Sequence, residues 1–211
     1  MNKFLKLLPM KWLLRLAMVF FRVVEVKDGD RRKIFHNLWT SVWLEEGYAH
    51  TDEPLSKIEE HYAIFDGYST DVILYFLGWP IGTMRLIRDN KDVGIPVLND
   101  FEITHEIVLP LIELTLLTVK RQWRGLMHLP SLVLWRYGYR TAVVKGTQEI
   151  VMAADWRLFH LLKRIFPFRE VGPKRFYEGS DTIPAALNLK QAKAVLAQKN
   201  PVLLRFFTGD K

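Results

Sequence analysis

Residues 112–127, IELTLLTVKRQWRGLM, join an apolar run that contains β-branched side chains to a basic loop at residues 120–125. A helical segment is expected to follow over residues 126–139. A strand that enters a loop and then a helix N-terminus brings backbone N–H groups together, and the helix dipole adds positive potential. Arg121 and Arg124 can add their own charge. The stretch therefore predicts a site for an anionic ligand that carries phosphate.

Charge and composition narrow the choice of partners. The 211 residues carry a net charge of +7, and residues 114–148 contain six Lys or Arg and no Asp or Glu. Acidic partners are therefore favoured. The sequence has no zinc-finger, RNP or long Lys/Arg motif, so we expect no nucleic acid partner. It has no cysteine, which excludes disulfides, thiolate metal sites and a cysteine nucleophile. We expect no metal site.

The N-terminal segment is basic and apolar. Residues 1–24 include five Lys or Arg and no acid, and their longest uncharged run, residues 16–21, is far shorter than the roughly 20 residues that span a bilayer. The segment also lacks the features of a signal peptide. An amphipathic helix over residues 1–22 could lie on an anionic membrane surface, or it could cover the protein's own core with its cations outward. We expect a cytoplasmic protein. If the helix lies on a membrane, we expect the protein to be peripheral on the inner face of that membrane.

Apolar periodicity and turn residues predict alternating strands and helices. The expected strands are residues 20–27, 71–77, 81–88, 107–119, 149–154 and 169–176. The expected helices are residues 31–46 with Asp30 as N-cap, 55–62, 126–139, 156–166 capped by Asp155, and 189–207 interrupted at Pro201. This order fits a mixed α/β fold, with a central twisted mixed sheet flanked by helices. The expected organisation is an N-terminal helix (1–22), one domain (23–188) and a helical tail (189–211).

Several short motifs occur in the order of one enzyme superfamily. The sequence carries Arg31, Phe35 and Trp39, then loosely placed Asp66 and Asp71, then Gly-Thr-Met-Arg at 82–85 and Glu-Leu-Thr-Leu at 113–116. The chain resembles the GNAT acyltransferases, and within them the N-acyl amino acid synthases and the acyl-homoserine-lactone (autoinducer) synthases. The autoinducer synthases carry Glu-x-Ser-Arg on the fourth strand, where this chain has Thr115 and Leu116 in place of the Ser and the Arg. The stretch at 172–185 resembles the tail of the N-acyl amino acid synthases.

This resemblance implies an activity. The chain is expected to move a long-chain acyl group from acyl carrier protein, or from acyl-CoA, to the amine of an amino acid or related small molecule by direct transfer. Alternatives are an autoinducer synthase, and a catalytically silent carrier-binding or membrane-surface protein on the same scaffold. No tightly bound cofactor is expected. The family's small residue at the end of the donor loop is Met127 here, which favours the phosphopantetheine arm of an acidic carrier protein over CoA.

The resemblance also implies site residues. A bulge in the strand at 111–119 would free backbone N–H groups around Leu117 and Val119 to polarise the thioester. Strand alternation would place Glu113, Thr115 and Leu117 on one face, and Glu113 is the candidate general base; alternatively, Glu113 forms a structural ion pair with Arg85. His105 and Glu106 are further candidates. The expected donor-binding residues are Lys120, Arg121, Gln122, Trp123, Arg124, Gly125, Leu126 and Met127, with Trp123 exposed. The expected acceptor or acyl pocket consists of Arg31, Phe35, Trp39, Arg85 and Thr115, unless the aromatic residues form core.

Overall fold

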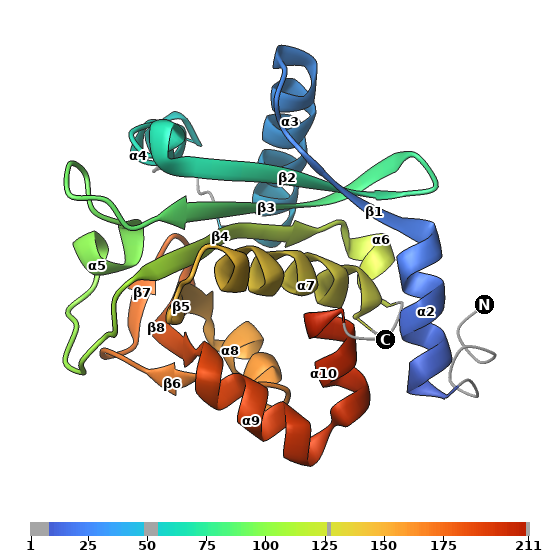
Figure 1. The fold of residues 1–211 in the computed structure, drawn as a ribbon. Coiled ribbons are helices and arrows are strands. Elements are labelled where there is room, and N and C mark those ends of the chain that lie inside the picture. Colours follow the sequence, from blue (N-terminus) through green and yellow to red (C-terminus); the bar gives the residue numbers. More distant parts are fainter. Residues whose placement is uncertain (1–8, 49–54, 126–127, 210–211) are drawn as a thin grey trace.

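The protein is built around one mixed sheet of eight strands (Figure 1). The computed structural model describes residues 9–48, 55–125 and 128–209. The sheet order is β1-β2-β3-β4-β5-β8-β6, and β7 pairs with β8. The strands are β1 (Phe21–Glu25), β2 (Ser69–Phe76), β3 (Trp79–Arg88), β4 (Leu111–Val119), β5 (Glu149–Asp155), β6 (Arg169–Glu170), β7 (Arg175–Tyr177) and β8 (Ser180–Asn188). Only β4 and β5 run parallel within this set.

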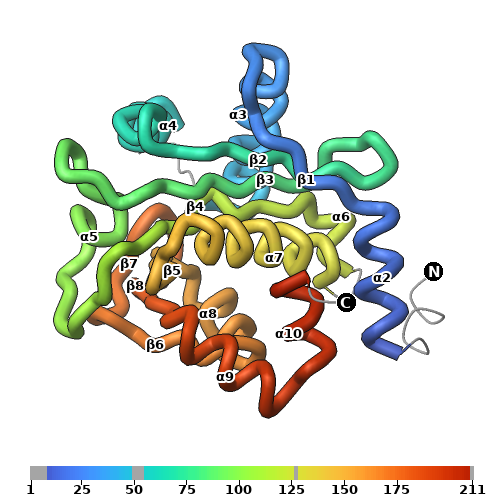
Figure 2. Tube along the Cα trace, viewed as in Figure 1, coloured from blue at the N-terminus to red at the C-terminus, as the bar shows by residue number. Residues whose placement is uncertain are grey.

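Helices cover both faces of the sheet (Figure 2). They are α2 (Met10–Phe20), α3 (Gly29–Glu46), α4 (Leu55–Ala63), α5 (Pro96–Asp100), α6 (Arg121–Arg124), α7 (Leu129–Val144), α8 (Trp156–Lys163), α9 (Leu189–Lys199) and α10 (Pro201–Thr208). The largest hydrophobic cluster joins α2, α7, α8, α9 and α10 to one face, and α3 and α4 form a second cluster on the other face. The predicted mixed α/β class with helices on both faces is confirmed. No helix among the described residues is both long and apolar enough to cross a bilayer.

Several predicted boundaries are wrong, and the helix expected over residues 126–139 is α7, Leu129–Val144. Three further cases concern one helix cap and two strands. The N-cap of α3 is Asp28 rather than Asp30, because the Asp28 carboxylate accepts from the Arg31 N–H at 2.8 Å. Strand β4 begins at Leu111, after the cis Leu109–Pro110 bond, and not at residue 107. The expected final strand at 169–176 is two short strands, and it is followed by β8, which was not predicted. The sequence did not predict β8 because it contains Pro184, and proline is rare inside central strands. In the structure Pro184 pairs with Ala153.

The predicted helix-capping features are largely confirmed. Asp155 caps α8 by accepting from the Arg157 and Leu158 N–H groups, and Pro130 lies in the first turn of α7. The C-terminal helical segment breaks at Pro201, as expected. In the N-terminal segment, α2 buries Leu13, Leu14 and Ala17 against the core, so it does cover the domain. Residues 1–8 of the expected N-terminal helix lie outside the described residues.

Strand β4 contains the bulge on which the site depends. Thr83 pairs with Thr118 and Arg85 with Thr115, so two residues, Leu116 and Leu117, stand opposite Met84 alone. Leu116 has a φ of 48°, in the left-handed region. The extra residue breaks the alternation of the strand, and Leu116 packs in the α3–α4 cluster while Leu117 packs against the α7 cluster. The expectation that Leu117 shares a face with Glu113 and Thr115 is therefore wrong.

Candidate active site

A cavity opens where β4 and β5 separate. The two strands pair only from Leu111–Glu149 to Glu113–Val151. Beyond that point lies a cavity of about 130 Å³, lined by residues 114–117 of β4, which include the bulge, by Met152 and Ala153 of β5, and by Trp43, Tyr62 and Glu178. The β4 edge that faces this cavity has no strand partner among the described residues beyond Glu113. A narrow slot between a backbone edge and polar side chains suits an extended thioester arm.

Glu178 lies in the wall of this cavity, and the sequence did not predict a role for its carboxylate. It lies in the turn between β7 and β8 with a φ of 46°, followed by Gly179 at 76°. Burial raises the pKa of the Glu178 carboxyl to about 7, although His61, Tyr177 and Tyr62 each act to lower it. A carboxyl with a pKa near neutrality is suited to accept a proton at physiological pH. Its position in the cavity makes Glu178 the best-placed candidate base.

A chain of polar groups connects Glu178 to the bulge. The Tyr62 hydroxyl is 3.5 Å from Glu178 Oε2, and the Thr115 hydroxyl donates to the Tyr62 oxygen at 3.3 Å. Burial, and then the charge of Glu178, raise the pKa of Tyr62 well above its usual value, so Tyr62 is a neutral hydrogen-bonding group. The described geometry therefore brings Thr115 to the cavity, where the sequence predicted an acceptor-site residue.

Asp100 is a second acidic group close to these hydrogen-bonded side chains. The Tyr177 hydroxyl donates to Asp100 at 2.8 Å, and His61 Nε2 lies 3.1 Å from the same carboxylate oxygen. Burial acts to raise the pKa of Asp100, but His61 and Tyr177 outweigh it and the net pKa is lowered. The His61 pKa is raised by Asp100 despite burial. The hydrogen bond from Tyr177 to Asp100 ties the turn that carries Glu178 to α5.

Glu113 is buried behind the cavity. Its side chain is 1% exposed, and Oε2 accepts from the Val97 N–H at 2.8 Å. Burial raises the pKa of Glu113 to about 8 against this hydrogen bond. The expected ion pair with Arg85 does not form, because Glu113 faces α5 and Arg85 stands opposite Thr115. Glu113 does not line the cavity, and its role as a base stays a prediction.

Arg85 is held by two acidic groups on its own side of the sheet. Its guanidinium forms a bidentate pair with Asp71 at 2.6 and 2.8 Å and lies 2.9 Å from Asp66 Oδ1. Its remaining Nη1 donates to the Tyr62 carbonyl at 2.9 Å. Asp66 and Asp71 were expected as loose family counterparts, and the structure places both on Arg85. With its donors engaged, Arg85 supports the Tyr62 backbone rather than a free acceptor carboxylate.

The rest of the Gly-x-x-Arg motif shapes the bulge. The Thr83 hydroxyl donates to the Leu116 carbonyl at 3.0 Å and lies 2.7 Å from the Thr118 hydroxyl. All three groups are buried, so the bulged carbonyl is satisfied from β3. Gly82 lies so close to β4 that a Cβ on it would be 2.6 Å from the Thr118 carbonyl oxygen.

Gly82→Ala is therefore expected to displace the bulged backbone. The clash is with backbone, which cannot turn aside as a flexible side chain can, so the free energy of unfolding should fall by about 1–3 kcal/mol. Urea unfolding of both proteins measures the change. Gly67→Ala is the control, because a Cβ at Gly67 meets nothing within 4 Å. Equal losses in the two variants would contradict a tight approach at Gly82.

The predicted donor loop is a short helix with mixed exposure. Lys120 N–H donates to the Ile81 carbonyl at 2.9 Å and fixes the start of α6. Arg124 is committed to Glu46 at 2.7 Å and to the Val119 carbonyl at 2.7 Å. Trp123 is half-buried and packs on Phe76 with ring centroids 4.6 Å apart, so the expectation of an exposed indole is wrong. Arg121, Gln122 and Gly125 are exposed, and Leu126 and Met127 lie outside the described residues.

The predicted acceptor residues of α3 do not meet at the cavity. Phe35 and Trp39 are core residues, 2% and 3% exposed, and Trp39 packs edge-on against Trp43 at 5.4 Å. Arg31 pairs with Asp28 at 3.2 Å in the first turn of α3. Of these aromatic residues, Trp43 is the one that reaches the cavity wall. The stripe of aromatic side chains thus supports the cavity from behind.

A bulged β4 that diverges from a parallel β5, with α7 connecting the two strands along the chain, is the arrangement of a GNAT-like fold. The family model of the N-acyl amino acid synthase FeeM matches residues 36–189. The chain belongs to this family.

Three solved structures share the fold. FeeM, an N-acyl amino acid synthase from uncultured soil microbes, superimposes with a TM-score of 0.65 at 15% identity, covering 84% of this chain and 97% of FeeM. The acyl-homoserine-lactone synthase LasI gives 0.59 at 14% identity, with 83% and 93% covered. Spermidine N-acetyltransferase from Vibrio cholerae, in complex with CoA and spermine, gives 0.52 at 16% identity, with 82% and 98% covered. No curated protein sequence matches the chain.

Proposed function

We propose that this acyltransferase moves a long-chain fatty acyl group from the phosphopantetheine arm of an acyl carrier protein to the amine of an amino acid. The observation that carries the proposal is the cavity between the separated β4 and β5, which has the bulged β4 backbone on one side and Glu178 on the other. Family membership over residues 36–189 supports the same reaction.

Glu178 would prepare the acceptor. Its carboxylate takes a proton from the acceptor ammonium, and the resulting amine nitrogen attacks the thioester carbonyl carbon. The tetrahedral oxyanion accepts a hydrogen bond from the backbone N–H of Leu117 at the β4 bulge. Leu117 lines the cavity, whereas Val119, the other residue expected to polarise the thioester, does not. Collapse of the intermediate breaks the C–S bond. The products are the amide, the free thiol of the carrier and one proton, so no covalent acyl-enzyme is needed.

An acidic carrier protein suits the surface around the donor loop. Residues 114–148 carry six Lys or Arg and no acid. Lys120 and Arg121 flank the start of α6, and neither forms an ion pair with any carboxylate of the described residues. Such cations mainly accelerate association with an acidic partner and lose their effect in salt. This basic rim favours a carrier protein over free CoA.

A donor comparison tests the proposal. The protein is incubated with an amino acid mixture and either palmitoyl carrier protein or palmitoyl-CoA, and N-acyl products are identified by mass spectrometry. We expect N-palmitoyl amino acids, with the higher kcat/KM for the carrier protein. Lys120→Gln with Arg121→Gln should lower kcat/KM for the carrier roughly tenfold, by more than it lowers the value for palmitoyl-CoA. The matched control is Lys190→Gln with Lys193→Gln, which removes the same charge from α9 instead of from the donor loop. No product from either donor would contradict the proposal.

A further inference from the structure

Helix α2 exposes a continuous apolar stripe on the side away from the core. Trp12, Leu16, Val19 and Phe20 recur at helical spacing, and Trp12 and Val19 are 53% and 74% exposed. The opposite side of the helix buries Leu13, Leu14 and Ala17. A helix that is apolar on both sides has more apolar surface than its own core needs.

The tip of the β2–β3 hairpin extends this stripe. The Leu77 N–H donates to the Phe20 carbonyl at 3.1 Å, so the tip adjoins the end of α2. Leu77 and Trp79 are 64% and 73% exposed. Leu77 and Gly78 have φ values of 48° and 90°, a two-residue turn that normally favours Asn-Gly. An exposed leucine in the left-handed region costs folding free energy without burying its side chain, so a contact with an external apolar surface would account for it.

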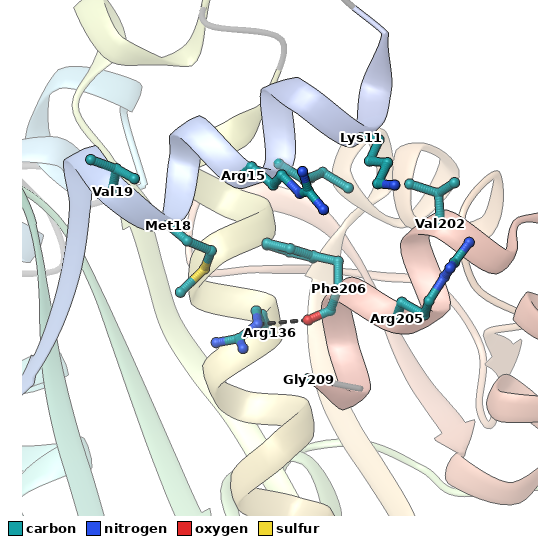
Figure 3. A pocket seen from close by; sticks show the side chains of 10 residues that line it. Lys11, Arg15, Met18, Val19, Arg136, Val202, Arg205, Phe206 and Gly209 are labelled. Carbon is teal, nitrogen blue, oxygen red and sulfur yellow. Dashed lines mark hydrogen bonds between the residues drawn. The ribbon is translucent and has the colours of Figure 1, made fainter. Parts of the chain in front are cut away.

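A basic groove lies beside the stripe, between α2, α7 and α10 (Figure 3). Its volume is about 670 Å³, and it is lined by four cations, Lys11, Arg15, Arg136 and Arg205, together with apolar side chains that include Met18 and Phe206. No carboxylate among the described residues lines it or pairs with these cations. Figure 3 shows the four cations reaching the groove from three helices.

Arg136 gives the groove a fixed charge. It is half-buried on α7, donates to the Phe206 carbonyl at 2.6 Å and lies over the Phe206 ring at 5.5 Å. Burial and the charge of nearby Arg140 lower the pKa of Arg136. No carboxylate among the described residues neutralises this guanidinium, so its charge is available to an anion from outside the protein.

We propose that the α2 stripe, the hairpin tip and the basic groove together form a docking surface for a bilayer that contains anionic phospholipids. The exposed Trp and aliphatic side chains enter the headgroup region, and the groove cations bind lipid phosphate. Apolar side chains beside cations match an anionic lipid surface in both properties. This surface is separate from the cavity between β4 and β5, and the proposal does not depend on the acyltransfer reaction.

Vesicle sedimentation with the full chain tests the charge component. The protein should bind vesicles of phosphatidylcholine with phosphatidylglycerol, and bind far less to phosphatidylcholine alone. Arg15→Gln with Arg205→Gln should weaken binding to the anionic vesicles roughly thirtyfold, the scale for removing two surface cations. Lys190→Gln with Lys193→Gln, with the same change in net charge, should leave binding almost unchanged. Equal binding to both vesicle types, or equal losses in the two variant pairs, would overturn the proposal.

Leu77→Asn tests the apolar component without risk to the fold. Asn tolerates the left-handed backbone better than Leu, so thermal stability should be retained or raised while vesicle binding weakens. Leu44→Ser is the control, because Leu44 is 57% exposed at the end of α3 and should not affect binding. Unchanged vesicle binding in Leu77→Asn would remove the hairpin tip from the surface. If the Arg15 and Arg205 variants instead lose turnover with acyl carrier protein in the absence of vesicles, the groove belongs to the carrier and the lipid proposal fails.

Discussion

Glu178→Gln lowers kcat/KM by about 10²–10⁴-fold, the range for loss of a positioned acid–base group, while the protein stays folded. Glutamine keeps the shape of the side chain and its hydrogen-bonding capacity toward Tyr62, but it cannot accept a proton from the acceptor ammonium. Steady-state kinetics with palmitoyl carrier protein and an amino acid acceptor measure the loss. Circular dichroism and thermal unfolding of the same preparation separate it from misfolding.

The pH profile identifies the same group. Burial raises the pKa of Glu178 to about 7, and only the ionised carboxylate can act as base. The rate of the wild-type protein should therefore fall as pH drops through about 7 and reach a plateau above it. Glu178→Gln should lose this acidic limb. A wild-type profile that is flat between pH 6 and 8 would remove Glu178 from the proton transfer.

Glu113→Gln is the matched control for this prediction. Glu113 is also a buried carboxyl with a raised pKa, about 8, so most of it is protonated at neutral pH and glutamine imitates that form closely. It accepts from the Val97 N–H and does not line the cavity, so turnover should change little. If Glu113→Gln instead loses most of its turnover while Glu178→Gln stays active, then Glu113 on β4, and not Glu178, is the general base.

The sequence predicts the framework of the site better than its side chains. The basic stretch after residue 119 and the Gly-x-x-Arg strand follow from local pattern, and the resemblance places a bulge in β4. The bulge itself undoes the alternation from which side-chain directions were inferred, so Leu116 and Leu117 exchange faces. The local sequence pattern of β4 does not predict the exact position of the bulge, because the extra residue depends on Thr83 and Gly82 of the neighbouring strand.

Glu178 was missed for a related reason. It lies in the turn between β7 and β8, and β8 could not be predicted because it contains Pro184. The position of Glu178 at the cavity depends on the pairing of β8 with β5. The one local signal is a glutamate before a glycine in a tight turn at Tyr177-Glu178-Gly179-Ser180, ahead of a β-compatible run. The partners of Arg85 were likewise hidden, because Asp71 meets it across the β2–β3 pair rather than along one strand.

Arg85→Met is expected to lower the free energy of unfolding by about 3–5 kcal/mol, because removing one partner leaves a buried charge uncompensated. Asp71 is 8% exposed and loses both hydrogen bonds from the guanidinium. The Tyr62 carbonyl also loses its donor, so the chain from Tyr62 to Glu178 loosens and turnover should fall along with stability. Urea unfolding measures the first effect and kcat the second.

Two further variants separate the buried charge from lost packing. Arg88→Met removes an exposed arginine three residues along the same strand and should change stability by less than about 0.5 kcal/mol. Arg85→Met combined with Asp71→Leu removes the buried carboxylate as well, and it should recover part of the loss because a buried pair replaced by apolar groups is often tolerated. Such recovery of stability without recovery of kcat would show that Arg85 serves the site by holding the Tyr62 backbone. If Arg85→Met alone is as stable as the wild type, then the buried Asp71 carboxylate does not need Arg85 to offset its charge.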